Sequence, residues 1–199
     1  MKDKVYHSSY TSGITELTPR PGSHGVPYVY AAKDKVVSVA FMTNKKNSCG
    51  DLSYWKGRNQ ETGKMAIVER YPGAFNDLYN GVSGSIYVLP GDTFQEDKTQ
   101  WDEEVVSAEA VPILEEIKID NIWEYLKELE KEGALEIYIY PNRHKSMSQN
   151  DDDLVQRILT RNWTNTFAKL QMVNPEFHEK LQNAANQYQI ISGIQKEKK

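Results

Sequence analysis

Four residues in two short segments near the start of the chain have side chains suited to holding a small molecule. His7 and Ser8 follow the run Val5-Tyr6 and offer an imidazole and a hydroxyl. Tyr28 and Tyr30 alternate with smaller residues in the second segment. Because an aromatic face attracts a flat group that carries positive charge, these tyrosines could hold a cationic ring.

Acidic residues further along the chain could supply the charge that a reaction needs. Glu103, Glu104 and Glu109 flank a run of small and apolar residues. Side chains alternate along a strand, so Glu104 shares a face with Val106. If Val106 lies in the core, Glu104 lies at the rim of the buried face, where a fixed carboxylate can stabilise developing positive charge. Glu104 is therefore the first candidate for a catalytic carboxylate, and Glu109 is the second.

Each of these residues also has an ordinary structural explanation. A histidine or tyrosine on a half-buried strand usually packs against its neighbours and bonds its polar tip locally. The glutamates are equally typical of a solvated sheet edge. Residue types alone leave both interpretations open.

The elements that carry these residues are predicted from hydrophobic periodicity, which changes in character near residue 119. Before it, runs rich in Val, Ile and Tyr alternate with turn residues, which predicts strands. The strands are expected at Lys4–His7, Tyr28–Ala31, Lys64–Arg70, Ser83–Leu89, Glu104–Ser107 and Val111–Ile119. One apolar helix is expected at Lys33–Met42 and a helical turn at Phe75–Tyr79. The helix should bury its apolar side chains, among them Val36, Val39, Ala40 and Phe41.

Beyond residue 119, apolar residues recur at helical spacing. The first helix is expected at Asp120–Glu132, with Asp120 as its N-cap and with Ile122, Trp123, Leu126 and Leu129 facing the core. A strand at Leu135–Tyr140, a helix from Asp151–Asp153 to Asn162 or Phe167, and a helix at Pro175–Ile190 follow. Surface loops are expected around Trp55 and Arg58 and around His144, and the carboxylates of Asp151–Asp153 should form a solvated helix cap.

Composition excludes several classes of protein. The chain has 199 residues, a net charge of -4 and a single cysteine, Cys49. The acidic balance argues against strong binding of duplex DNA, and a lone cysteine excludes an intrachain disulfide framework. The four histidines, His7, His24, His144 and His178, lack ligand spacing, so no metal site is expected. No membrane span or secretory signal is evident, which predicts a cytoplasmic protein without a membrane partner.

The order of the candidate segments resembles the ADP-ribosyltransferase fold of the His-Tyr-Glu type, as in poly-ADP-ribose polymerases and diphtheria toxin. That fold has a strand with a histidine, then a strand with a tyrosine leading into a helix of small and apolar residues, then a late strand with a glutamate. Val5-Tyr6-His7-Ser8-Ser9, Val26-Pro27-Tyr28-Val29-Tyr30-Ala31-Ala32 and Trp101-Asp102-Glu103-Glu104-Val105-Val106 stand in that order. The resemblance covers residues 4–118, and Ser8 stands where the family usually has glycine.

The resemblance implies an α+β protein with a split antiparallel sheet in residues 1–118 and a helical C-terminal segment, residues 119–199, packed on it. It implies NAD as the substrate. His7 and Ser8 would hold the ribose and the nicotinamide amide, and Tyr28, or else Tyr30, would stack on the nicotinamide ring. Glu104, or else Glu109, would stabilise the ribosyl cation.

Three functions are consistent with the resemblance. The leading one is an NAD-dependent protein that transfers ADP-ribose to an acceptor or hydrolyses NAD. The second is a catalytically inert binding module that keeps the fold. The third is a nucleotide-processing enzyme similar to an RNA 2′-phosphotransferase, which would use basic residues to hold phosphate.

Overall fold

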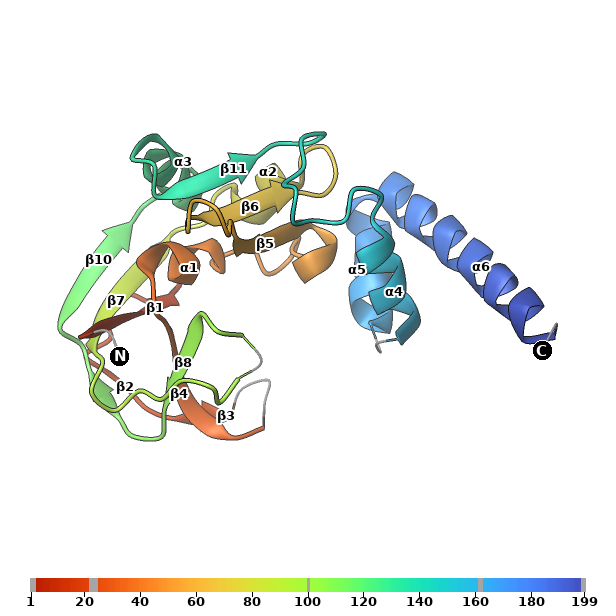
Figure 1. Cartoon of the computed structure of the whole chain (residues 1–199). Coiled ribbons are helices and arrows are strands. Elements are labelled where there is room, and N and C mark those ends of the chain that lie inside the picture. Colours follow the sequence, from red (N-terminus) through yellow and green to blue (C-terminus); the bar gives the residue numbers. More distant parts are fainter. Residues whose placement is uncertain (1–2, 22–24, 100, 161–162, 198–199) are drawn as a thin grey trace. The chain divides into compact units, whose positions relative to one another are not determined.

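The computed structural model describes all residues except 1–2, 22–24, 100, 161–162 and 198–199 (Figure 1). The side chains of the described residues are described only before residue 189. The chain forms two compact units, and each is discontinuous in sequence. The first consists of Met1–Asn44 and Tyr79–Glu136, and the second of Lys45–Leu78 and Ile137–Lys199. This division differs from the expected consecutive segments 1–118 and 119–199, because residues around Cys49 share a hydrophobic core with the C-terminal helices.

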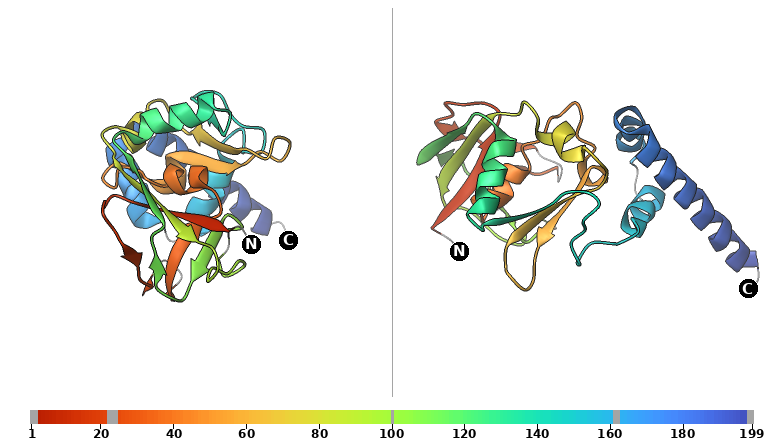
Figure 2. Two further views of the ribbon diagram at one scale, coloured as in Figure 1. Left: turned by 90° about the vertical axis from the view of Figure 1, so that its left-hand side faces the viewer. Right: turned by 90° about the horizontal axis from the view of Figure 1, so that it is seen from above.

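The first unit is built on an antiparallel sheet, and both helices and antiparallel sheets are present, as the predicted α+β class requires. Its strands are β1 (Lys4–Ser9), β3 (Arg20–Pro21), β4 (Pro27–Ala32), β7 (Gly84–Pro90), β8 (Glu104–Ser107) and β10 (Glu115–Ile119). They follow the order β10-β7-β1-β4-β3, and β8 also pairs with β4 (Figure 2). The expected strand Val111–Ile119 is divided: β9 (Val111–Pro112) pairs instead with β2 (Glu16–Leu17).

Helix α1 (Lys35–Ala40) follows β4 directly and is shorter than the predicted Lys33–Met42. Asp34 caps its N-terminus by accepting a hydrogen bond from the amide of Val36. Val36, Val39 and Ala40 are buried, as expected. The prediction was wrong for Phe41, which is 44% exposed. The reason is that the helix ends at Ala40, so Phe41 is the C-cap and leaves the buried face.

Helix α3 (Ile122–Lys131) confirms the predicted apolar face, since Ile122, Leu126 and Leu129 are buried. Trp123 is half-buried and stacks on Tyr79, with ring centroids 5.8 Å apart. The N-cap is Asn121 rather than Asp120, because the Asn121 side chain accepts from the amide of Glu124.

The second unit contains a three-stranded sheet in the order β11-β6-β5, and β11 (Leu135–Tyr138) straddles the boundary between the units. Strand β6 (Met65–Glu69) is buried at every position, and β5 (Tyr54–Arg58) pairs with it. The expectation of a surface loop at β5 was wrong. Charged residues and Gly57 interrupt the alternation of apolar residues that would predict a strand here. Gly57 is nevertheless needed, because a Cβ atom at this position would lie 2.5 Å from the Trp55 ring.

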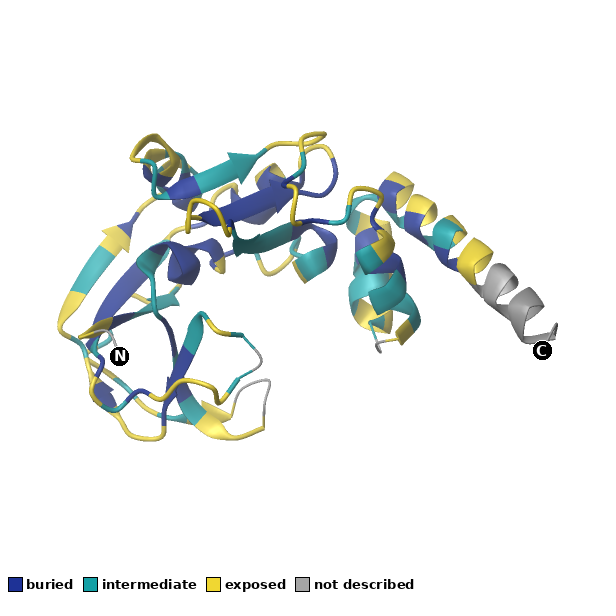
Figure 3. Cartoon of the chain, viewed as in Figure 1, coloured by how far each residue is buried: buried dark blue, intermediate teal, exposed yellow. Residues whose placement is uncertain are grey.

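Three helices of the second unit share a core with its short elements, the 3-10 helix η1 (Gly50–Leu52) and helix α2 (Ala74–Tyr79) (Figure 3). The three are α4 (Asp152–Thr160), α5 (Thr164–Val173) and α6 (Pro175–Glu197). The predicted end of α4 at Asn162 lies outside the described residues. Cys49 is buried in this core together with Leu154, Leu170 and Leu181. Among the described residues, no helix is long and apolar enough to cross a membrane.

Two expectations for the segment before α4 were wrong, because side chains distant in sequence cover it. His144 is 2% exposed and stacks on Trp55, with ring centroids 5.4 Å apart and planes at 15°. Asp151 is 1% exposed rather than solvated, and it accepts hydrogen bonds from Arg143 and Lys180.

Candidate functional site

One pocket of the first unit contains four of the six candidate site residues. It has a volume of about 180 Å³ and is open to solvent. Its described lining residues come from β1, β4, α1, the residues just after β1 and α1, and the start of β8 with the segment before it: Tyr6, His7, Ser8, Tyr10, Tyr30, Ala31, Ala32, Ser38, Phe41, Met42, Trp101 and Glu104. Thus His7, Ser8, Tyr30 and Glu104 line one cavity, and Tyr28 and Glu109 are not part of it.

The sheet explains why residues so distant in sequence meet. Strand β4 lies between β1 and β8, and Ala32 is paired with Tyr6 on one side and with Glu104 on the other. The pair Tyr6 and Ala32 is the one partner pair described between β1 and β4. Beyond this pair, the imidazole of His7 on β1 contacts the backbone carbonyl of Tyr30 on β4.

His7 is fixed by a hydrogen bond across this junction. Its Nδ1 lies 2.8 Å from the carbonyl oxygen of Tyr30, and a carbonyl can only accept, so Nδ1 carries the proton. Burial lowers the pKa of His7 below 6.5, although the bond to Tyr30 acts in the opposite direction. A neutral imidazole protonated on Nδ1 presents Nε2 as a hydrogen-bond acceptor at pH 7.

Ser8 is held by a residue that the sequence prediction missed. Its hydroxyl lies 2.6 Å from the hydroxyl of Ser38, which is buried in α1. Ser38 interrupts the apolar run Val36-Val37-Ser38-Val39-Ala40, and a polar residue in a buried helix is the signal that could have identified it. The two hydroxyls join β1 to α1 at the wall of the pocket.

The two candidate tyrosines differ in position along β4. Tyr30 lines the pocket. Its pKa is raised above 10.0, mainly by burial and to a smaller extent by the charge of Glu104. Tyr28 is paired in register with Arg20 of β3, away from the junction with β1. The two rings contact each other edge to face, with centroids 6.1 Å apart. The sequence prediction preferred Tyr28, whereas the pocket contains Tyr30.

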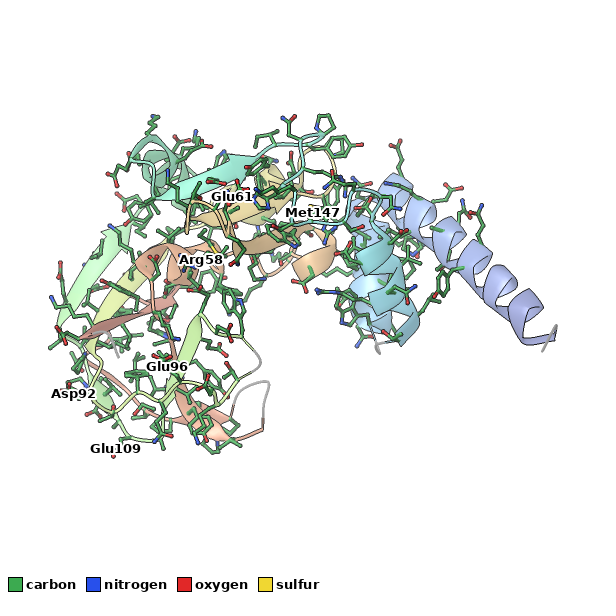
Figure 4. The ribbon with its side chains drawn as sticks, viewed as in Figure 1. Arg58, Glu61, Asp92, Glu96, Glu109 and Met147 are labelled. Carbon is green, nitrogen blue, oxygen red and sulfur yellow. The ribbon has the colours of Figure 1, made fainter. Side chains whose placement is uncertain are left out.

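The two candidate glutamates and their neighbour Glu103 also differ in position. Glu104 is half-buried and lines the pocket, at the first position of β8. Glu103 is not among the lining residues, and its carbonyl accepts from the amide of Lys33 at 3.0 Å. Glu109 is exposed beyond the end of β8, and Figure 4 shows it at the outer edge of the first unit.

The pocket has the character of a site for an organic ligand. Glu104 is the one carboxylate and His7 the one histidine among its described lining residues. No group of three or more His, Cys, Asp or Glu side chains that could hold a metal ion occurs in the described part of the chain. Aromatic rings, hydroxyls, one neutral imidazole and one carboxylate can together bind a flat cationic group that is attached to a polyol.

Compared with known proteins, the chain matches no family model, no curated protein and no solved structure.

Proposed function

We propose that the first unit binds NAD and cleaves its nicotinamide–ribose bond, as an ADP-ribosyltransferase or NAD glycohydrolase. One observation carries the proposal: His7, Tyr30 and Glu104, from three neighbouring strands, line a single pocket. These are the three residue types, in the same order along the chain, that the resemblance to the His-Tyr-Glu family assigns to NAD. The α+β architecture with an antiparallel sheet is compatible with that fold.

The charges of the pocket fit the nicotinamide end of NAD. The nicotinamide ring is flat and carries a positive charge, so it is attracted both to the face of Tyr30 and to the carboxylate of Glu104. The described lining residues include no Lys or Arg that would repel the ring.

The proposed reaction uses Glu104 as the stabilising charge. When the bond between the ring nitrogen and ribose C1′ breaks, its electron pair moves to the nitrogen and neutralises the ring. Positive charge then develops on C1′ and the ribose ring oxygen, where a fixed carboxylate lowers the energy of the transition state. Water or an acceptor nucleophile bonds to C1′ and releases its proton to solvent. Nε2 of His7 would accept a hydrogen bond from a ribose hydroxyl and orient the sugar.

Titration with NAD by calorimetry, together with an assay of nicotinamide release, tests the proposal. The wild-type chain should bind NAD and release nicotinamide. Binding without release would favour the inert module that keeps the fold. Failure of both would contradict the proposal.

Replacing Tyr30 by Leu should weaken NAD binding by about tenfold, because the substitution removes the aromatic face but keeps an apolar side chain. The matched control is Tyr28→Leu, the same substitution two residues away on the same strand but outside the pocket. That variant should bind NAD within about twofold of the wild type. Calorimetric affinities for both variants check the prediction, and a larger loss for Tyr28→Leu would assign the ring to the other tyrosine.

NAD affinity should fall as the pH drops below 6.5. The pKa of His7 is lowered by burial, so the imidazole stays neutral at pH 7 and gains its second proton only as the pH falls through that lowered pKa. Protonation removes the Nε2 acceptor and adds a positive charge beside a cationic ligand. The His7→Gln variant keeps an acceptor that does not titrate, so its affinity between pH 5 and pH 7 should be flat. An equal decline in both proteins would exclude His7 as the titrating group.

A further inference from the structure

The sheet of the first unit ends in two strands that differ in how well they are protected. The strand order β10-β7-β1-β4-β3 places β10 at one end and β3 at the other (Figure 1). Strand β3 has two residues and contains Pro21, and a short edge strand with a proline resists pairing with another chain. Strand β10 (Glu115–Ile119) has five residues and no proline. The end of the sheet at β10 is therefore the edge that can accept a further strand.

The outer edge of β10 has no partner within the part of the chain that the structure describes. Each residue of β10 is in register with a residue of β7, from Glu115 opposite Val88 to Ile119 opposite Gly84. Beyond this pairing, no other strand or backbone hydrogen bond is described for β10. Alternate N–H and C=O groups of an antiparallel strand point to opposite edges, so those on the outer edge of β10 can bond a further strand.

The charges of β10 form a pattern that is complementary to itself. Glu116 and Lys118 lie on one face of the strand, and Ile117 between them lies on the other. If a second copy pairs antiparallel with Ile117 opposite Ile117, Glu116 of each copy lies opposite Lys118 of the other. Directly opposed residues of opposite charge stabilise a strand pair, and the twofold symmetry produces this contact twice. Charges in this order attract a second copy, whereas charges of one sign would repel it.

Glu116 is held in place for such a contact by three hydrogen bonds. Its Oε1 accepts from the amide of Gly13 at 3.0 Å, the hydroxyl of Ser85 at 2.6 Å and the hydroxyl of Tyr87 at 3.1 Å. Among the described residues, its Oε2 has no hydrogen-bond donor. Lys118 is exposed and forms no ion pair with a described residue. Because the acceptor is already fixed, an ion pair with a second copy costs little additional side-chain entropy at Glu116.

The opposite face of β10 supplies apolar surface in the same register. Ile117 is half-buried, and its partner Ile86 on β7 is fully buried. In the antiparallel pair the two copies of Ile117 are direct neighbours, with Cα atoms about 4.5 to 5.5 Å apart. Each then covers part of the surface that the other leaves in water, which is favourable. One register therefore pairs the charges on one face and covers apolar surface on the other.

We propose that the chain forms a symmetric dimer through β10, in which two copies pair antiparallel about Ile117 and join their sheets into one. Main-chain hydrogen bonds provide the association, and the two contacts between Glu116 and Lys118 fix the register. The inference is independent of the proposed function, because no residue of β10 is among the described lining residues of the pocket.

Sedimentation equilibrium of the full chain, over roughly a hundredfold range of concentration, measures the dissociation constant of the dimer. Lys118→Glu should raise this constant by about tenfold or more, because it replaces two attractive contacts by two repulsive ones. Lys64→Glu makes the same change of charge at an exposed position of the second unit and should stay within about twofold of the wild type. A wild type that is monomeric throughout, or equal losses for both variants, would overturn the proposal.

Mixing two charge variants tests the complementarity directly. Lys118→Glu and Glu116→Lys should each dimerise poorly alone, since each carries charges of one sign at both positions. An equimolar mixture should form a dimer, because the chain with two carboxylates then lies opposite the chain with two ammonium groups. General loss of stability cannot produce such a recovery. No recovery, with both variants folded by circular dichroism, would contradict the proposed contacts.

A cysteine at the twofold axis tests the register without changing Glu116 or Lys118. Ile117→Cys places two thiols on opposed residues within the range of a disulfide, so oxidation with diamide should give a covalent dimer. Glu115→Cys is the matched control, because its two copies would be about 14 Å apart in this register. The native Cys49 is 1% exposed and should not compete. A covalent dimer from Ile117→Cys alone would support the proposal, and equal yields, the reverse or no covalent dimer would overturn it.

Discussion

Replacing Glu104 by Gln should reduce the rate of nicotinamide release by about a hundredfold. The substitution keeps the size of the side chain and a hydrogen-bond acceptor, but it removes the negative charge that stabilises the ribosyl cation. One such fixed group in a preorganised site contributes about 3 kcal/mol to transition-state stabilisation. Because the positive charge on the ribose develops only as the bond breaks, the loss should appear mainly in kcat, with a much smaller change in NAD affinity.

The control for this experiment is Glu109→Gln. It changes the net charge by the same amount, but Glu109 is exposed beyond the end of β8 and does not line the pocket. Its turnover should match the wild type within about twofold. A hundredfold loss in Glu109→Gln with normal turnover in Glu104→Gln would reverse the assignment. Unchanged turnover in both variants would exclude a catalytic role for either carboxylate.

Replacing Asp151 by Asn should destabilise the second unit by about 3 kcal/mol, since removing one partner of a buried ion pair leaves uncompensated charge. Asp151 is 1% exposed and has cationic partners from three parts of the unit. Its carboxylate oxygens lie 3.4 Å from Arg70, 2.7 Å from Arg143 and 2.6 Å from Lys180. Asp153 also pairs with Arg70, at 2.6 Å, so Arg70 keeps one partner in the variant.

The choice of Asn isolates the charge from the backbone. Asp151 has a φ of 65°, a left-handed conformation that Asn adopts more readily than most residues, so the substitution should add little strain. Asp152→Asn is the matched control, because Asp152 is the exposed neighbour and bonds only Asn150 among the contacts described for it. Urea unfolding gives the free energy of unfolding for each variant. A loss below about 1 kcal/mol for Asp151→Asn, or equal losses for both variants, would contradict the prediction.

Low pH should reproduce the effect of the Asp151 substitution. Burial raises the pKa of Asp151, but the hydrogen bonds and charges of Arg143 and Lys180 outweigh burial, and the pKa lies below 3.8. A carboxyl whose pKa is lowered by folding stabilises the folded state above its unfolded pKa, and this stabilisation is lost as the pH falls through the lowered value. The wild type should therefore lose more stability below pH 4 than Asp151→Asn does.

Hydrophobic periodicity alone could not choose between Tyr28 and Tyr30, because the pattern along a single strand treats two residues on the same face alike. Tyr28 and Tyr30 are two positions apart, so they belong to the same face of β4. Their difference arises from the neighbouring strands: Tyr28 is paired with Arg20 of β3, and Tyr30 lies at the junction with β1. Glu104 is likewise distinguished by its pairing with Ala32.

The local pattern of the sequence determined most of the elements in the first unit and the type of chemistry available to it. Alternating apolar residues predicted β1, β4, β7 and β8, and helical spacing predicted the buried face of α3, because these patterns depend on near neighbours. The tertiary structure decided what is enclosed: it exposed Phe41, buried His144 against Trp55, and surrounded Asp151 with Arg70, Arg143 and Lys180. Burial and charge pairing of this kind depend on residues tens of positions away, and no local pattern of the sequence records them.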